Sequence, residues 1–289
     1  MAQIGSYTIQ QRLYGDEISY TCLASHGERQ VEMTCFPVRE DLEIAFYVRL
    51  QRELELIAAL EDVPLLPIEE TGVDAGVCYV VHPALGGDPL TEDQFPLSLE
   101  KTLYIARRIS QALDALHRLG LVHGDLKPEH IRLDAQDQVY LTGYGRWKCL
   151  QAQASSVPHL VAGALGYRAP EYDIHDVEPG PAADVYSLGM LVFHLLSGQL
   201  PFQPHTPLGW ATNHLLSPPA DIREWRPGTP AHVAAALQRA MHKNPAQRFA
   251  SAGDFLAALE NQHPISVPGR EKRQPYWAEH LERRVPRPS

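Results

Sequence analysis

Two short runs of the sequence contain residues whose types and spacing could take part in chemistry. The first, at 123–130, reads His-Gly-Asp-Leu-Lys-Pro-Glu-His and places Asp125 two residues before Lys127. The second is Gly143-Tyr144-Gly145, which begins eighteen residues after Asp125. A positioned aspartate can act as a general base and contribute about 10²–10⁴ in rate. That contribution depends on a substrate held beside it, so the rest of the chain decides what these residues do.

The secondary structure that must position these runs changes along the chain from strands to helices. Alternating, β-branched and aromatic residues predict strands first, and apolar spacings of three and four predict helices later. We expect strands at 7–13, 19–24, 30–36, 77–81, 131–133 and 139–141, helices within 41–60 and through 103–116, and mostly helices over 185–259. Residues 263–289 are rich in proline and basic side chains, which is typical of a flexible tail.

Composition and charge limit the classes of function. The net charge of −10 argues against a protein that binds nucleic acid or an anionic membrane surface. No run of eighteen apolar residues and no secretory signal is seen, so we expect a cytoplasmic protein without a membrane span. The four cysteines lie far apart, which favours reduced thiols over a disulfide framework or a zinc site.

These runs, in this order, resemble the motifs of the protein kinase family, and most closely those of bacterial Ser/Thr kinases. The run at 123–130 is similar to the catalytic loop, and Gly143-Tyr144-Gly145 falls where the family carries Asp-Phe-Gly. Ala169-Pro170-Glu171 resembles the end of an activation segment, and Arg248 is placed to pair with Glu171. Asp184 resembles the buried aspartate that holds the catalytic-loop backbone.

The resemblance implies an α+β fold with two lobes. We expect one kinase-like domain at 5–262, made of a β-rich N-lobe with one main helix at 1–85 and a helical C-lobe at 86–262, followed by the tail. It also assigns the chemical positions. Asp125 and Lys127 match the proton acceptor and the phosphate-contacting lysine. His130 and Gly143 stand at the two magnesium-ligand positions. The positions of the nucleotide pocket are degenerate, and they hold Tyr14, Asp16, Ser19, Glu32, Thr34, Glu53 and His82.

The substitutions in the pocket oppose the binding of a nucleotide. Side chains replace the glycines that would close over the phosphates, and Asp16 with Glu17 brings charge of the wrong sign. At about 4 Å and an effective dielectric constant of ~20, each like-charge contact costs roughly 4 kcal/mol. Thr34 replaces the phosphate-gripping lysine, and residues 1–100 contain no lysine to take its place. Strand alternation directs Glu32 into the space that roofs the purine in the family.

Few cations remain for a triphosphate in this reading. Binding of a triphosphate would have to rely on Arg12, Arg49, Arg52 or Lys127. Glu53 has Arg12 or Arg49 as candidate partners, and the alternative is that Glu53 is an exposed helix glutamate without a role in the site. His130 is a poor ligand for a hard cation, and a zinc pair of His123 with His130 is a weak alternative. We therefore expect no cofactor and no metal.

The sequence thus predicts a pseudokinase that regulates or scaffolds protein partners of unknown identity. Two alternatives stay open: an atypical Ser/Thr kinase or nucleotide transferase that uses ATP and Mg²⁺ in a rearranged site, and a nucleotide-binding switch without catalysis. Candidate partner surfaces are the helix with Glu53, the segment 147–160 and the basic tail. The activation segment offers Ser155 and Ser156 but no threonine, and Ala164 stands where the family places one, which puts engagement of a substrate peptide in doubt.

Overall fold

A computed structural model of the chain describes residues 2–38, 44–74, 76–87, 89–146, 148–149, 165–174 and 178–261. The chain divides into two compact units. The first contains Met1–Leu90, Ala115–Asp125 and Glu129–Val161, and the second contains Thr91–Asp114, Leu126–Pro128 and Ala162–Ser289. The candidate site residues, Lys127 excepted, belong to the first unit.

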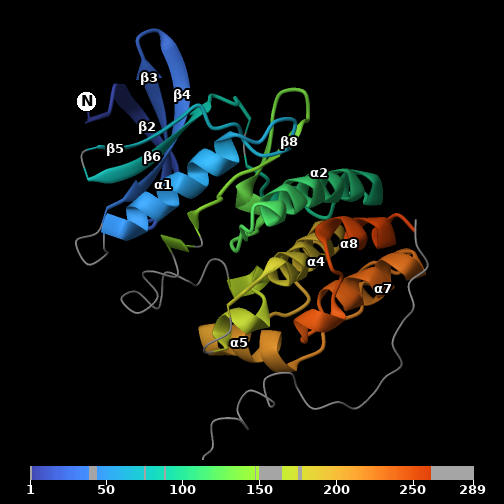
Figure 1. Cartoon of the computed structure of the whole chain (residues 1–289). Coiled ribbons are helices and arrows are strands. Elements are labelled where there is room, and N and C mark those ends of the chain that lie inside the picture. The colour runs from blue at the N-terminus through green and yellow to red at the C-terminus, as the bar shows by residue number, and fades with distance from the viewer. Residues whose placement is uncertain are drawn as a thin grey trace, which may run out of the picture. The chain divides into compact units, whose positions relative to one another are not determined.

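A six-stranded antiparallel sheet dominates the first unit (Figure 1). Its strands are β1 (Gln3–Ile4), β2 (Tyr7–Gly15), β3 (Tyr20–His26), β4 (Arg29–Pro37), β5 (Glu70–Asp74) and β6 (Val77–Pro83), in the spatial order β1-β2-β3-β4-β6-β5. The helix α1 (Ile44–Ala58) lies against β5 and β6. The register sets Glu32 of β4 opposite Leu23 of β3 and His82 of β6, so Glu32 occupies a central strand with a neighbour on each side.

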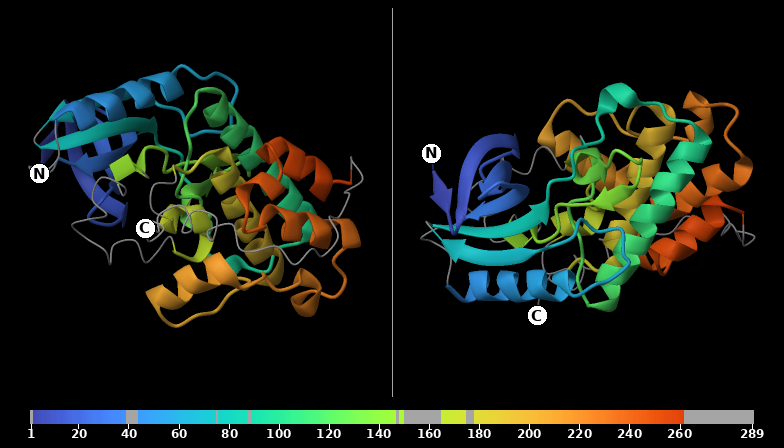
Figure 2. Two further views of the ribbon diagram at one scale, coloured as in Figure 1. Left: turned by 60° about the horizontal axis from the view of Figure 1, so that its bottom comes forward. Right: turned by 90° about the horizontal axis from the view of Figure 1, so that it is seen from above.

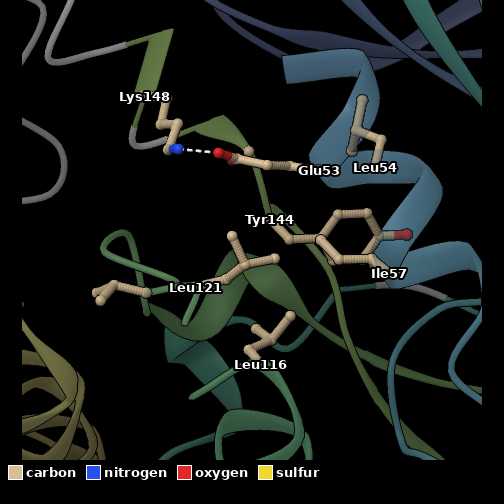
Figure 3. Close-up of a pocket in the computed structure, with 9 residues that line it drawn as sticks. Glu53, Leu54, Ile57, Leu116, Leu121, Tyr144 and Lys148 are labelled. Atoms are coloured by element: carbon tan, nitrogen blue, oxygen red, sulfur yellow. Dashed lines mark hydrogen bonds and ion pairs between the residues drawn. The ribbon is translucent and has the colours of Figure 1, made fainter. Parts of the chain in front are cut away.

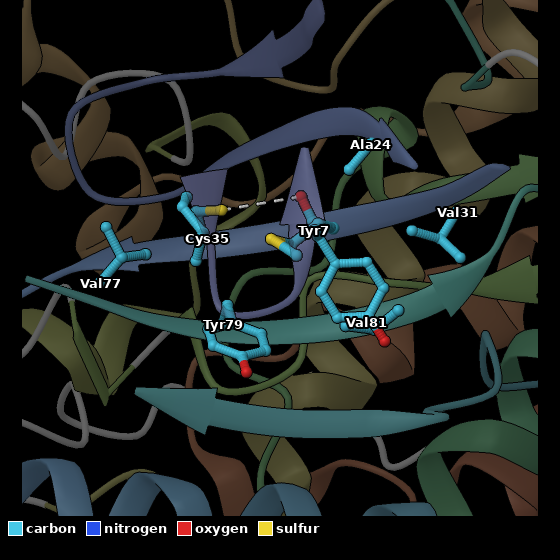
Figure 4. Packing of buried hydrophobic residues seen from close by; sticks show 9 residues of the cluster. Tyr7, Ala24, Val31, Cys35, Val77, Tyr79 and Val81 are labelled. Carbon is cyan, nitrogen blue, oxygen red and sulfur yellow. Dashed lines mark hydrogen bonds between the residues drawn. The ribbon is translucent and has the colours of Figure 1, made fainter. Parts of the chain in front are cut away.

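Apolar side chains from β2, β3, β4 and β6 form the core of this sheet. Figure 4 shows Tyr7, Ala24, Val31 and Val81 packed in one cluster, and Met33 in the same cluster is fully buried. Burial of this size removes apolar surface from water and accounts for the alternation seen in the sequence. Because β4 is buried along most of its length, any charged residue on it must find a partner inside the protein.

A small two-stranded sheet, β7 (Ile131–Leu133) and β8 (Val139–Leu141), follows the short 3₁₀ helix η2 (Pro128–His130). Leu66 N–H donates to Leu141 O at 3.0 Å, and Leu90 N–H donates to Ile131 O at 2.8 Å. These backbone bonds attach the hairpin to segments near 65 and 90 in the same unit. They fix the position of Arg132, the central residue of β7.

The second unit is helical. It contains most of α2 (Leu99–Arg118), together with η1 (Glu92–Gln94), η4 (Pro170–Asp173), α4 (Pro181–Ser197), α5 (Pro207–Leu216), α6 (Ile222–Trp225), α7 (Ala231–Ala240), η5 (Pro245–Gln247) and α8 (Ala252–Leu259). Figure 2 shows α4 with α7 and α8 on its flank. The α4 helix is apolar around most of its circumference, as expected for a helix that other elements surround.

Buried ionic contacts hold this unit together. Arg248 donates to both oxygens of Glu171 at 2.6 and 2.7 Å and to Ala182 O at 2.7 Å, which confirms the pairing expected from the sequence. Asp114 accepts from the N–H groups of Ala252 and Gly253, both at 3.0 Å, and so caps the start of α8. These contacts maintain the fold and involve no chemistry.

The predicted elements agree with the structure in type. β7 and β8 match their predicted ranges, and the other strands and helices differ by a few residues at their ends. Within the described ranges no helix is both long and apolar enough to cross a membrane. Three parts named in the sequence analysis lie outside the described residues: Trp147, the segment 150–164 and the tail 263–289. The segment 150–164 includes Ser155, Ser156 and Ala164.

Candidate functional site

The turn that follows β2 folds back on itself and contacts Arg146. Asp16 Oδ1 accepts from the N–H groups of Ile18 and Ser19 at 2.9 and 3.2 Å, and Asp16 N–H donates to Ser19 O at 2.8 Å. Gly15 makes the turn possible, because at its φ of +111° a Cβ would lie 2.4 Å from Ser19 O. The turn therefore presents a carboxylate where a glycine loop would present bare backbone.

Arg146 joins that turn to Asp125. Its Nε donates to Asp125 Oδ2 at 2.8 Å, and its Nη1 donates to Asp16 Oδ1 at 3.0 Å and to Ser19 Oγ at 2.5 Å. Nη2 donates to the other oxygen of Asp16. The side chains of Arg146 and Asp125 are 6 % and 1 % exposed, so this guanidinium and carboxylate neutralise each other away from water.

The charge of Arg146 also sets the ionisation of Asp16. Burial alone would raise the pKa of Asp16, but the hydrogen bonds and charge of Arg146 and the N–H groups of Ile18 and Ser19 lower it to about 2. Asp16 is therefore ionised at neutral pH and bound at both oxygens. The expectation that Asp16 and Glu17 would form an uncompensated acidic lining is wrong, since Asp16 is paired and Glu17 is exposed.

Two histidines hold the backbone around Asp125. His123 Nε2 donates to Thr142 O at 2.8 Å, and its Nδ1 accepts from Asp125 N–H at 3.3 Å, so both ring nitrogens bind the backbone. His130 Nδ1 donates to Asp125 O at 2.6 Å. Within the described ranges no group of three or more His, Cys, Asp or Glu residues could hold a metal ion.

The His130 ring lies directly against Gly143. Gly143 has a φ of +83°, and a Cβ added there would lie 2.6 Å from Cγ and Nδ1 of His130. The two positions at which the family resemblance expects magnesium ligands thus hold an imidazole and the space that it fills. No carboxylate can be accommodated at 143 without moving this ring.

A buried ion pair crosses between β4 and β7. Arg132 Nη1 donates to Glu32 Oε2 at 2.8 Å and Nη2 donates to Oε1 at 3.2 Å, and the two side chains are 3 % and 5 % exposed. Arg132 also donates to Tyr14 Oη at 2.5 Å and to Gly87 O. Glu32 Oε1 accepts from Leu85 N–H at 3.1 Å. Glu32 is thus buried and paired, and its partner is a residue that sequence reasoning missed.

Neutral groups surround Thr34, the residue at the position of the phosphate-gripping lysine. Its Oγ1 lies 3.3 Å from His82 Nε2 and 3.4 Å from Thr21 Oγ1. His82 Nδ1 donates to Pro67 O at 2.9 Å, and burial lowers the pKa of His82 to about 4, so the ring is neutral at pH 7. Tyr144 donates to Leu66 O at 2.8 Å beside this ring.

Glu53 of α1 pairs with Lys148, and not with Arg12 or Arg49 as expected. The contact links Glu53 Oε1 to Lys148 Nζ, with side chains 19 % and 42 % exposed. Figure 3 shows this pair at one end of a small pocket, with Tyr144 beneath it. The other lining residues are mostly apolar: Leu54, Ile57, Leu116, Leu121, Val122 and Gly145.

Sequence reasoning found every acid of this site but missed its three cations. Arg132 could have been recognised, because an arginine inside the apolar run 131–133 needs a buried acidic partner, and Glu32 in β4 has the same need. Arg146 and Lys148 carry no such signal, since they follow Gly145 in a segment without apolar periodicity. Lys127 is half-buried in the loop between Asp125 and η2.

Comparisons with known proteins agree with one another. The family model for the protein kinase domain matches residues 19–258. The Ser/Thr-protein kinase PknD of Mycobacterium tuberculosis is 33 % identical over 225 residues, covering 75 % of this chain and 33 % of PknD. PknA of Mycobacterium bovis is 30 % identical over 239 residues, covering 80 % of this chain and 54 % of PknA. The chain thus spans between a third and about half of the length of these relatives.

A solved structure shares the fold. The crystal structure of the PknI kinase domain of Mycobacterium tuberculosis superposes with a TM-score of 0.70 at 25 % identity, covering 91 % of this chain and 98 % of that one. The α+β class expected from the sequence, with a β-rich N-terminal part and a helical C-terminal part, is confirmed.

Proposed function

Because the chain belongs to the protein kinase family, we propose that it is a pseudokinase that regulates or scaffolds other proteins and transfers no phosphate. The observation that carries this proposal is the bridge from Asp125 through Arg146 to Asp16. Phosphoryl transfer relies on positioning and charge neutralisation, with an aspartate that accepts the proton of the substrate hydroxyl. Here the guanidinium of Arg146 lies between that aspartate and the turn that would cover the phosphates.

The residues present do not fit a magnesium ion. Mg²⁺ requires hard oxygen ligands in near-octahedral geometry. Gly143 offers no oxygen from a side chain, and His130 presents an imidazole whose ring occupies the adjacent space. Asp125 is committed to Arg146. We therefore assign no step to a metal.

Two further positions that bind or orient phosphate in the family, Thr34 and Glu53, are also altered, and both changes support the proposal. Thr34 makes neutral contacts with His82 and Thr21 in place of a lysine that grips phosphate. Glu53, whose counterpart would orient that lysine, binds Lys148. The first change removes a cation that would contact a polyanion, and the second removes the acid that would orient that cation.

Binding and activity measurements test the proposal directly. The purified chain should show no shift of its unfolding midpoint with ATP, ADP or ATP with Mg²⁺ or Mn²⁺, because a ligand at 100 times its Kd would add about 2.7 kcal/mol of stability. Transfer of labelled phosphate to itself or to a generic Ser/Thr substrate should equal that of Asp125→Ala. Transfer that Asp125→Ala abolishes would overturn the proposal, and saturable nucleotide binding without transfer would instead identify a nucleotide-responsive switch.

A further inference from the structure

Lys243 is a half-buried lysine between α7 and η5 in the second unit, and its amine lies against aromatic rings. Nζ is 4.6 Å from the centroid of the Phe202 ring and 5.8 Å from that of the Tyr186 ring. Phe202 is 6 % exposed and Tyr186 is fully buried. Water is therefore excluded from this side of the amine, and such surroundings disfavour the charged form of a lysine.

The hydrogen bonds of Lys243 add little in favour of the charged form. Nζ donates to Asn213 O of α5 at 3.0 Å, and a neutral amine can donate the same bond. Within the described ranges Lys243 forms no ion pair with a carboxylate. Glu171, an acid of the same unit, has both oxygens bound by Arg248. The ring faces attract an ammonium by about 0.5–2 kcal/mol, and this is the main contact that favours the charged form.

A second cation lies beside Lys243. Arg248 Nη2 donates to Lys243 O at 3.2 Å, and Arg248 Cζ is 4.8 Å from the centroid of the same Tyr186 ring, so two cations share that ring. A guanidinium keeps its proton, so repulsion between the two groups acts on the lysine. Burial first, and then the charge of Arg248, lower the pKa of Lys243 to about 7. A large share of the chains therefore has a neutral amine here at neutral pH.

The other titratable groups around this amine supply no counter-charge. His214 of α5 packs against Tyr186 and Phe202, and burial lowers its pKa to about 3, so its ring is neutral. Burial raises the pKa of Tyr186, which keeps the phenol protonated. Burial also lowers the pKa of His242, the residue before Lys243. Among these groups, Lys243 is the one that changes charge near neutral pH.

We propose that Lys243 is a modification site, at which a nucleophilic amine takes an acyl group from a small acyl phosphate or acyl thioester. Desolvation and an adjacent cation are the two ways in which a lysine is activated as a nucleophile, and Lys243 has both. The residue keeps part of its surface exposed, so a small donor can reach it. The inference goes beyond the proposed function and does not depend on it.

The product of this step fits the surroundings of Lys243. The lone pair of the neutral amine forms the N–C bond, the bond from the acyl carbon to phosphate or to sulfur breaks, and one amine proton goes to water. The resulting amide is uncharged, so the repulsion with Arg248 disappears. Its N–H can keep the bond to Asn213 O, and the methyl of an acetyl group can lie against the Phe202 ring.

Competitive acetylation tests the assignment, because the chain has only five lysines: Lys101, Lys127, Lys148, Lys243 and Lys272. The native chain is treated at neutral pH with limiting acetyl phosphate or, separately, with acetyl-CoA, and peptide mass spectrometry gives the rate at each lysine. We expect Lys243 to react at least about tenfold faster than the matched control Lys148, whose amine binds Glu53. The rate at Lys243 should rise with pH to a plateau, with a midpoint near pH 7.

Two variants test whether the surroundings activate the amine. Phe202→Gln places a polar group against Nζ, whereas Phe202→Leu keeps an apolar one. We expect the midpoint of the pH profile of Lys243 to move upward by about one unit or more in Phe202→Gln and to stay near the native value in Phe202→Leu. Equal midpoints in the two variants would contradict activation by desolvation.

The native chain alone is enough to decide the inference. Preferential acetylation of Lys243 by either donor supports it, and the faster donor identifies the class of compound. A rate at Lys243 no higher than at Lys148 with both donors overturns it. A midpoint close to the ordinary lysine value of about 10.4 also overturns it, whether or not the Phe202 variants fold. Acetylation that appears only after urea unfolds the chain overturns it as well, because the amine is then closed in the native state.

Discussion

The imidazole of His130 occupies the space that any side chain at position 143 would need. A Cβ on Gly143 would lie 2.6 Å from two atoms of that ring, well inside van der Waals contact. The φ of +83° at Gly143 is a second obstacle, because side chains with a Cβ rarely adopt it. The two residues are therefore matched to each other, and any side chain at 143 requires the ring of His130 to move.

Restoring an aspartate at 143 should damage the fold before it restores any metal binding. We expect Gly143→Asp to lower the free energy of unfolding by about 2–4 kcal/mol, from overpacking against His130 and the unfavourable φ. Combining it with His130→Asn should recover part of that loss. Urea unfolding of the single and double variants measures the coupling, and a double variant no more stable than Gly143→Asp would refute the packing explanation.

Arg146 and Lys148 stand two residues apart and offer a matched comparison. Arg146→Ala leaves the buried carboxylate of Asp125 without this cation and should cost about 3–5 kcal/mol of unfolding free energy. Lys148→Ala removes a pair whose lysine is 42 % exposed and should cost less than about 1 kcal/mol. Equal costs for the two variants would mean that the bridge from Asp125 to Asp16 does not stabilise the first unit.

His82 should make stability depend on pH below 6.5. Its pKa is about 4 in the folded chain and near 6.5 when unfolded, so the unfolded state binds the proton first as pH falls. Stability is then complete above pH 6.5 and decreases between pH 6.5 and 4, by up to about 3 kcal/mol. The variant His82→Met should lose this component. His214, whose pKa burial also lowers, is present in both chains and cancels in the comparison; identical pH profiles would contradict the prediction.

Thr34→Lys alone should not create a nucleotide site. The new ammonium would replace a hydroxyl that contacts His82 and Thr21, while Arg146 would still bind Asp16 and Asp125. We expect no shift of the unfolding midpoint with Mg-ATP for this variant. Mg-ATP binding by Thr34→Lys would show that the lysine alone was limiting.

Local pattern was enough to predict the elements and their order. Alternation identified β4 and β7, and the family resemblance predicted the Glu171–Arg248 pair correctly. Pairing across the fold was beyond the sequence. Glu32 and Arg132 lie a hundred residues apart, and only the register of β4 with β6 and the attachment of β7 near residue 90 bring them together.

Because the sequence does not show pairing across the fold, the expectation of an uncompensated acidic lining was wrong. Counting the charges near each motif left Asp16 and Glu32 uncompensated, because no cation lies beside either residue in the family alignment of the sequence. The actual partners, Arg146 and Arg132, come from segments that follow the catalytic-loop run. Asp16 and Glu32 are therefore neutralised by buried partners and do not form a surface of like charges.

Glu32 and Arg132 belong to one chain, so dilution of the protein does not separate them. The backbone tethers Glu32 and Arg132 at a local concentration that no solution condition alters, short of unfolding. Dialysis removes neither charge, so the contact between β4 and β7 lasts as long as the fold does. The contact between β4 and β7 therefore forms in every folded copy of the chain, whatever small molecules surround it.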